Sequence, residues 1–190
     1  MRPLVYDDAA AAAAFFGIFA AWAMSETILQ MRSQGGERDP SYVWMLAGSA
    51  AGIGLAFLAS AAGARLPGPD WLPVAVGLPV MLAGAALRWW SVRTLGRFFT
   101  VTVGVADDHR LVDTGPYAVL RHPSYTGMLI VYLGLGIGLD SWLSIAAGVL
   151  VPAAACVYRI GHEERQLREG LGPSYDDYAR RTSRLVPGLW

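Results

Sequence analysis

The chain has 190 residues, of which 54% are hydrophobic and only 16% are charged, whereas about 25% of the residues of an average soluble domain are charged. Basic and acidic residues number 15 each, and this balance excludes the strongly basic composition typical of nucleic-acid-binding proteins. Cys156 is the only cysteine, which excludes an intramolecular disulfide and a multi-cysteine metal site.

Five uncharged stretches are long enough to cross a membrane as helices. A bilayer core about 30 Å thick needs about 20 apolar residues in a helix, with a range of about 17 to 25. The rest of the chain is too short to cover five such helices in water, so we predict an all-α integral membrane protein with five transmembrane helices. The stretches are residues 9–25, 41–64, 71–87, 123–139 and 141–158.

The arginines predict the orientation of these spans. With the N-terminus outside, the cytoplasmic segments 26–40, 88–122 and 159–190 hold 13 of the 15 arginines, and only Arg2 and Arg65 fall outside them. Such a bias is typical of cytoplasmic loops. The chain has no Lys and no Asn, which suggests a GC-rich coding sequence, so we expect a bacterial inner membrane and a cytoplasmic C-terminus.

Residues 1–87 are predicted to form three transmembrane helices with short connections. The acidic residues Asp7 and Asp8 precede the first apolar run, where a signal peptide carries positive charge, so we expect this span to be retained. Small residues in the next two spans should allow close approach between helices. They are Gly48, Gly52, Gly54, Gly77 and Gly84.

Residues 88–190 hold nearly all the polar side chains. Residues 88–99 mix Trp and Phe with arginines, which predicts a helix that leaves the bilayer after residue 87 and lies at the headgroup boundary, with its aromatic rings as anchors. A short extended piece at 100–105 and turns at 107–109 and 113–116 should follow.

The last two spans must form a tight antiparallel hairpin, residues 123–158, because almost no residues separate them. The second span of this hairpin should continue as a helix into the cytoplasm until two glycines and a proline stop it at 170–173. We expect Ser174 to cap a short helix there, with Asp176 and Asp177 in its first turn.

Two polar clusters, residues 115–127 and 159–167, stand at the cytoplasmic mouths of this hairpin and should lie side by side. Arg159, Glu163 and Gln166 share one helix face, and Glu164 and Leu167 line its edge. Opposite Arg121 and His122, this face could bind a zwitterionic or anionic ligand. Ordinary ion pairs at the end of a helix explain the same spacing equally well.

The same residues resemble a known family. Arg121-His122-Pro123-Ser124-Tyr125-Thr126-Gly127, then Arg159 with Glu163, Glu164 and Leu167, then Leu171-Gly172 with Tyr175 and Tyr178, and a closing Leu185-Val186-Pro187 follow one another in order. Together they resemble the isoprenylcysteine carboxyl methyltransferase family. The resemblance covers residues 88–190, and the first three spans carry no comparable signature.

This resemblance implies an integral-membrane methyltransferase that uses S-adenosylmethionine. The cofactor would lie between the cytoplasmic ends of the last two membrane helices and a C-terminal helical tail that closes the pocket. A lipophilic small molecule or a lipidated substrate would enter from the bilayer, among membrane lipids. Neither a metal nor a nucleic acid is expected, and no Rossmann domain is needed.

Residue by residue, the resemblance divides the site into a cofactor part and a reacting part. Arg121 and Arg159 would hold a substrate carboxylate, and Glu163 completes the expected catalytic set. The expected cofactor contacts are Tyr117, Leu120, His122, Pro123, Tyr125, Glu163 and Glu164.

Three alternatives remain open from the sequence. If the acceptor is a thiol or an amine, a base is required, and Glu163, Glu164 or His122 are the candidates. A membrane reductase of the sterol-reductase-like type would bind NADPH in the same pocket. A small membrane scaffold would need neither nucleotide.

Overall fold

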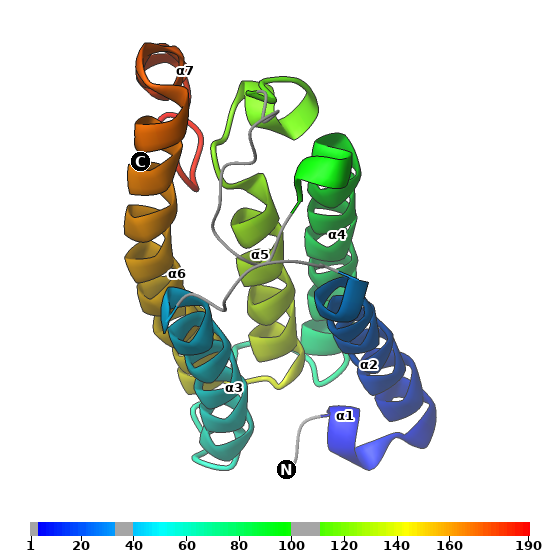
Figure 1. Ribbon diagram of the computed structural model, residues 1–190. Coiled ribbons are helices and arrows are strands. Elements are labelled where there is room, and N and C mark those ends of the chain that lie inside the picture. Colours follow the sequence, from blue (N-terminus) through cyan, green and yellow to red (C-terminus); the bar gives the residue numbers. More distant parts are fainter. Residues whose placement is uncertain (1–3, 33–39, 100–110) are drawn as a thin grey trace.

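A computed structural model describes residues 4–32, 40–99 and 111–190 of the chain (Figure 1). These residues form helices and no named strand; the one β-bridge among them is isolated and joins Leu120 to Ser183. The elements are α1 Leu4–Asp7, α2 Ala9–Arg32, α3 Pro40–Ser60, α4 Leu72–Leu95, η1 Gly96–Phe98, η2 Gly115–Ala118, α5 Pro123–Gly138, α6 Trp142–Leu171 and α7 Pro173–Arg181.

Four of these helices are long and apolar enough to cross a membrane, namely α2, α3, α4 and α6. The fifth expected span corresponds to α5, which is apolar but has only 16 residues. At about 1.5 Å per residue such a helix measures about 24 Å, less than the bilayer core of about 30 Å. The length criterion therefore supports an integral membrane protein with four candidate spans.

Close glycine contacts hold α4 against α5 along their length. A Cβ added to Gly84 would lie 2.6 Å from the carbonyl oxygen of Gly127, and one added to Gly77 would lie 2.6 Å from that of Gly134. Gly48 and Gly52 of α3 meet α6 in the same way. The predicted role of the glycines is confirmed for these positions, but it is wrong for Gly54, whose Cβ position meets nothing within 4 Å.

The predicted hairpin is confirmed, since α5 and α6 are antiparallel and joined at Leu139–Ser141. Asp140 is buried in this turn and accepts hydrogen bonds from Arg65 Nε and from the backbone N–H of Leu66. These bonds tie the turn to the connection between α3 and α4. The hairpin and the N-terminal helices are thus fixed to one another at this end of the bundle.

Three predicted helix boundaries are wrong. The first span does not end at residue 25, because α2 continues to Arg32, and the second ends at Ser60 and not at residue 64. The helix predicted over residues 88–99 is confirmed as far as Leu95, as a continuation of α4, and Arg88 in this helix pairs with Glu26 of α2. Ser174 does not cap the last helix: α7 starts at Pro173 with Gly172 as its N-cap, as suits the preference of proline for a first turn. The predicted pieces at 100–105 and 107–109 lie outside the described residues, whereas the turn at 113–116 leads into η2.

The first turn of α5 lies deeper in the helix bundle than the C-terminal end of α6. Tyr125, two residues after the start of α5, contacts Glu163 of α6. From Glu163, α6 runs on to Leu171 and is followed by α7, so it rises past the first turn of α5 (Figure 1). This difference in length leaves room above α5 for a site.

Candidate active site

A cavity of about 350 Å³ begins above α5 and continues between α2 and α3. Its size falls within the range of about 300 to 1,000 Å³ that is common for small-molecule sites. One end is polar and aromatic, lined by Tyr117, Arg121, His122, Tyr125, Arg159, Glu163, Gln166, Tyr175 and Tyr178. The part between α2 and α3 is lined mainly by apolar side chains, with a few polar ones among them: Trp22, Ala23, Met45, Leu46, Ala50, Ile53, Met128 and Tyr132, together with Glu26, Thr27, Gln30, Ser49 and Arg88.

Tyr125 links an arginine to a carboxylate at the polar end. Its hydroxyl accepts a hydrogen bond from Arg159 Nε at 2.7 Å and donates one to Glu163 Oε2 at 2.9 Å. The His122 ring stacks on the Tyr125 ring, with centroids 5.7 Å apart and planes 10° apart. Nδ1 of His122 lies 3.7 Å from Glu163, so four polar side chains from α5, its N-cap and α6 form one group.

Glu164, the next residue, lies in different surroundings. Its side chain is 1% exposed and pairs with Arg121 Nε at 2.8 Å and Arg184 Nη2 at 3.0 Å, while Arg168 Nη2 lies 3.5 Å away. The hydrogen bond to Glu164 raises the pKa of the Arg184 guanidinium. Glu164 therefore joins α6 to the chain before α5 and to the tail after α7.

The tail after α7 returns along the segment that carries Arg121 and His122. The backbone N–H of Arg121 donates to Ser183 at 2.7 Å, and that of His122 donates to Arg184 at 3.1 Å. The Thr126 hydroxyl donates to the carbonyl of Leu185 at 2.8 Å. These bonds explain how a segment with almost no regular structure holds the two candidate site residues Arg121 and His122 in fixed positions.

Three tyrosines at the polar end remain protonated. Burial raises the pKa of the Tyr117, Tyr175 and Tyr178 phenols well above the ordinary value. The Tyr178 hydroxyl donates to the carbonyl of Tyr117 at 2.8 Å, which joins α7 to η2.

Tyr175 Oη and Trp22 Nε1 are buried and have no hydrogen-bond partner among the described residues. Buried polar groups usually have partners, so these two lining atoms could each bond to a ligand in the cavity.

The structure brings together most of the residues that the sequence indicated. Tyr117, Arg121, His122, Tyr125, Arg159 and Glu163 line the cavity. Leu120, Pro123 and Glu164 are buried but are not among its lining residues. Arg121 is largely engaged elsewhere, because besides Glu164 it donates from Nη1 to the carbonyls of Ala179, at 2.8 Å, and Thr182.

The N-terminal helices contribute cavity residues that the sequence did not indicate. Glu26 of α2 and Arg88 of α4 both line the cavity and form a two-pronged ion pair, with Nε–Oε1 at 2.6 Å and Nη2–Oε2 at 2.5 Å. An ionisable residue within a membrane span is a candidate functional residue, and Glu26 lies inside the candidate span Ala9–Met31. Phe98 and Phe99, expected as interfacial anchors, also line the cavity.

No group of three or more His, Cys, Asp or Glu side chains suited to a metal occurs in the described parts of the chain. The polar end offers instead a carboxylate, phenols and an imidazole beside aromatic rings. These groups fit an organic ligand that carries both a positive and a negative charge.

The chain is similar to known proteins over its central part and over its fold. Residues 75–169, half of the chain, match the family model described as the isoprenylcysteine carboxyl methyltransferase family. A probable protein-S-isoprenylcysteine O-methyltransferase of Oryza sativa subsp. japonica is 35% identical over 119 residues, 62% of each chain. Protein-S-isoprenylcysteine O-methyltransferase B of Arabidopsis thaliana is 35% identical over 113 residues, 58% of this chain and 57% of the relative.

A solved structure is similar over a longer part of the chain. It is that of the eukaryotic intramembrane Ras methyltransferase of the isoprenylcysteine carboxyl methyltransferase type, with a TM-score of 0.66 and 27% sequence identity. The match covers 92% of this chain and 65% of the other. The present chain thus spans less than two thirds of the length of these relatives, and the match to the solved structure supports the membrane fold described above.

Proposed function

The chain belongs to the isoprenylcysteine carboxyl methyltransferase family, and on that premise we propose that it is an S-adenosylmethionine-dependent membrane methyltransferase. We propose as its acceptor the carboxylate of a lipophilic, isoprenylcysteine-like molecule. The observation that carries the proposal is the continuity of the cavity, in which the polar group around Tyr125 meets an apolar space between two membrane helices. An acceptor with a charged head and an apolar chain fits such a space.

The cofactor part of the site comprises the His122–Tyr125–Glu163 group with Tyr117 beside it. When bound, S-adenosylmethionine supplies an electrophilic methyl group on a sulfonium. Glu163 provides a negative charge for the positive part of this ligand, and Tyr175 Oη is a buried donor without a partner among the described residues. Leu120, Pro123 and Glu164 would act from behind the lining, by holding Tyr117, Tyr125 and Arg121 in place.

The acceptor part of the site centres on Arg159. A carboxylate, with a reference pKa near about 4, is ionised at neutral pH and needs no general base. The planar guanidinium of an arginine matches the two oxygens of such a group. Arg121 would contribute less, because Glu164 and two backbone carbonyls already engage it. Catalysis would then depend on fixed alignment of the acceptor and on exclusion of water by the buried aromatic lining.

The orientation of the chain belongs to the same proposal. We propose that α5 completes a five-span topology, in which the N-terminus lies outside and the polar end of the cavity faces the cytoplasm of a bacterial inner membrane. The distribution of arginines supports this orientation. The lipophilic acceptor would reach Arg159 from the bilayer, through the apolar space between α2 and α3.

A panel of ligands distinguishes the proposed methyltransferase from a membrane reductase and from a scaffold without enzymatic activity. A ligand present at 100 times its dissociation constant stabilises a protein by about 2.7 kcal/mol, which a thermal shift of the detergent-solubilised chain would detect. S-Adenosylhomocysteine should stabilise the chain and NADP should not. Stabilisation by NADP alone would support a membrane reductase, and stabilisation by neither would support a scaffold.

The substitution Arg159→Lys tests the acceptor. Lysine keeps the charge but lacks the planar fork, so methyl transfer to a carboxylate acceptor should fall strongly while the affinity for S-adenosylhomocysteine stays near that of the wild type. A wild-type rate in this variant would contradict a carboxylate acceptor bound at Arg159.

A further inference from the structure

The guanidinium of Arg159 is held on several sides, and two of its contacts come from the first turn of α3. Besides the bond from Nε to Tyr125, Nη1 of Arg159 donates to Ser41 Oγ at 3.2 Å. The guanidinium carbon also lies 5.3 Å from the centroid of the Tyr42 ring. Ser41 is 1% exposed, Arg159 2% and Tyr42 5%. Polar and cation–π contacts of this kind are strongest where water is excluded.

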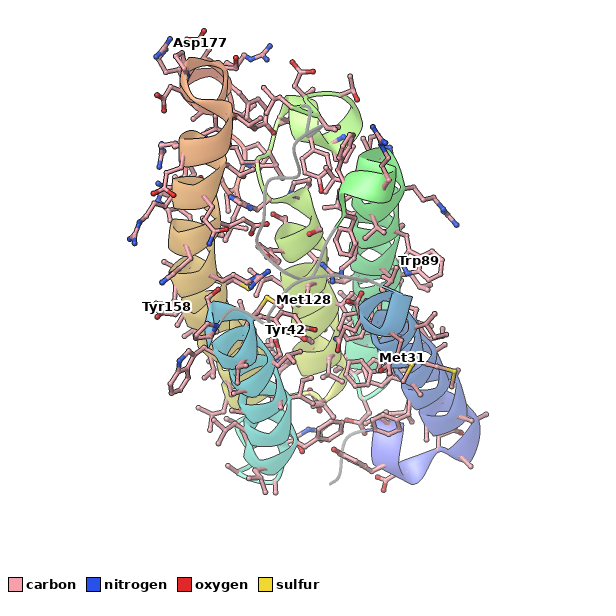
Figure 2. All side chains as sticks on the ribbon, viewed as in Figure 1. Met31, Tyr42, Trp89, Met128, Tyr158 and Asp177 are labelled. Atoms are coloured by element: carbon pink, nitrogen blue, oxygen red, sulfur yellow. The ribbon has the colours of Figure 1, made fainter. Side chains whose placement is uncertain are left out.

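Tyr42 lies at the cavity and not merely beside the arginine. Figure 2 shows Tyr42 of α3 and Met128 of α5 directed toward the same central space, and both residues line the cavity with Arg159. The contact between Tyr42 and Arg159 joins a helix outside the family match, residues 75–169, to a residue inside it. The N-terminal helices thereby take part in shaping the reacting end.

We propose that Ser41 and Tyr42 are positioning residues that set the orientation of Arg159 toward the acceptor carboxylate, an inference that rests on the proposed function. An arginine side chain has many rotamers, and a bidentate contact requires one plane of its guanidinium. The guanidinium carbon lies over the Tyr42 ring, and such a cation–π contact restrains the group without using any of its N–H donors. Tyr125 and Ser41 then fix the rotation within that plane.

The docking of α3 on α6 has other contacts besides those of these two residues. Gly48 and Gly52, further along α3, meet Ala155 and Pro152 of α6 at distances that admit no larger side chain. A substitution at Tyr42 therefore leaves the main contact between the two helices intact. This separation makes a positioning role testable.

The test compares Tyr42→Leu, which removes the ring, with Tyr42→Phe, which keeps the ring and loses only the hydroxyl. Trp44→Leu is the matched control, because Trp44 lies in the same turn of α3 but is 63% exposed and does not line the cavity. With N-acetyl-S-farnesylcysteine as acceptor, Tyr42→Leu should lower kcat/KM by about ten-fold. Tyr42→Phe and Trp44→Leu should stay close to the wild type, and Ser41→Ala should show a smaller loss than Tyr42→Leu. All four variants should keep wild-type affinity for S-adenosylhomocysteine.

A double-mutant cycle separates positioning from a general effect on structure. The affinity for the same acceptor is measured at equilibrium, without cofactor, in the wild-type background and in Arg159→Gln. Tyr42→Leu should weaken binding in the first background and have no further effect in the second. An equal loss in both backgrounds, or no loss in either, would overturn the inference. Absence of both S-adenosylhomocysteine binding and methyl transfer in the wild type would instead overturn the proposed function.

Discussion

Among single residues, Glu163 and Glu164 differ most sharply in their predicted effects. Glu163 lines the cavity. If it holds the proposed cofactor, Glu163→Gln removes a charge-assisted bond and should weaken S-adenosylhomocysteine binding by about 1.5 to 3 kcal/mol. Glu164 is buried among arginines, so Glu164→Gln should instead lower stability, because breaking a buried ion pair costs about 3 to 5 kcal/mol.

Calorimetric titration and thermal unfolding of both variants check this pair of predictions. Each variant is the control for the other, since the two positions are adjacent and receive the same substitution. Unchanged affinity in Glu163→Gln, at a wild-type unfolding temperature, would remove Glu163 from the cofactor site.

The sequence could predict which residues gather at the site, but not the role of each. The two clusters lie at the mouths of one hairpin, so a short turn was enough to bring Arg121, His122 and Glu163 together. Glu164 is turned away from the cavity toward arginines that include Arg184, which reaches it because the tail folds back along residues 119–122. Such a contact between distant segments has no periodic signal in the sequence.

At the scale of helices, the glycine contacts between α4 and α5 predict that an added methyl group lowers stability at the glycines in contact and not at an exposed glycine. A Cβ on Gly134 would lie 2.5 Å from the backbone nitrogen of Met81, whereas one on Gly161 of α6 meets nothing within 4 Å. Gly134→Ala should therefore lower the free energy of unfolding by about 1 to 3 kcal/mol. Gly161→Ala, in the same kind of structure, should be neutral or slightly stabilising. Equal unfolding midpoints for both variants in detergent would contradict this account of the helix contact.

The ion pair between Glu26 and Arg88 is the polar link between α2 and α4. The two side chains are 12% and 8% exposed, so either single substitution leaves an unpaired buried charge. Glu26→Leu and Arg88→Met should each cost about 3 to 5 kcal/mol of stability, while the double variant should regain most of the loss. Urea unfolding of the three variants measures the coupling, and additive losses would show that the two residues act independently.

This pair also explains why one helix end could not be predicted. A charge normally marks the end of an apolar span, so the sequence places the end of the first span at residue 25, before Glu26. Arg88 supplies the opposite charge from a helix more than 60 residues away in the chain, and α2 can therefore continue past Glu26 to Arg32.

For the whole molecule, the fold fixes which segments lie at the same end of the helix bundle, and the arginines predict which end faces the cytoplasm. The turn after α3 is tied to the start of α6 by a hydrogen bond from Trp142 N to the carbonyl of Ala64. Ala62 is exposed at that end, and Ser174 is exposed at the start of α7, beyond the other end of α6.

In a Cys156→Ala background, Ala62→Cys should react with a membrane-impermeant maleimide added to intact cells. Ser174→Cys should react only after the membrane is opened, because the positively charged segments stay in the cytoplasm. The reverse pattern would invert the proposed orientation and would place Glu163 and Arg159 at the outer face, away from a cytoplasmic cofactor. Labelling of both sites in intact cells would contradict a path in which α4, α5 and α6 each traverse the bilayer.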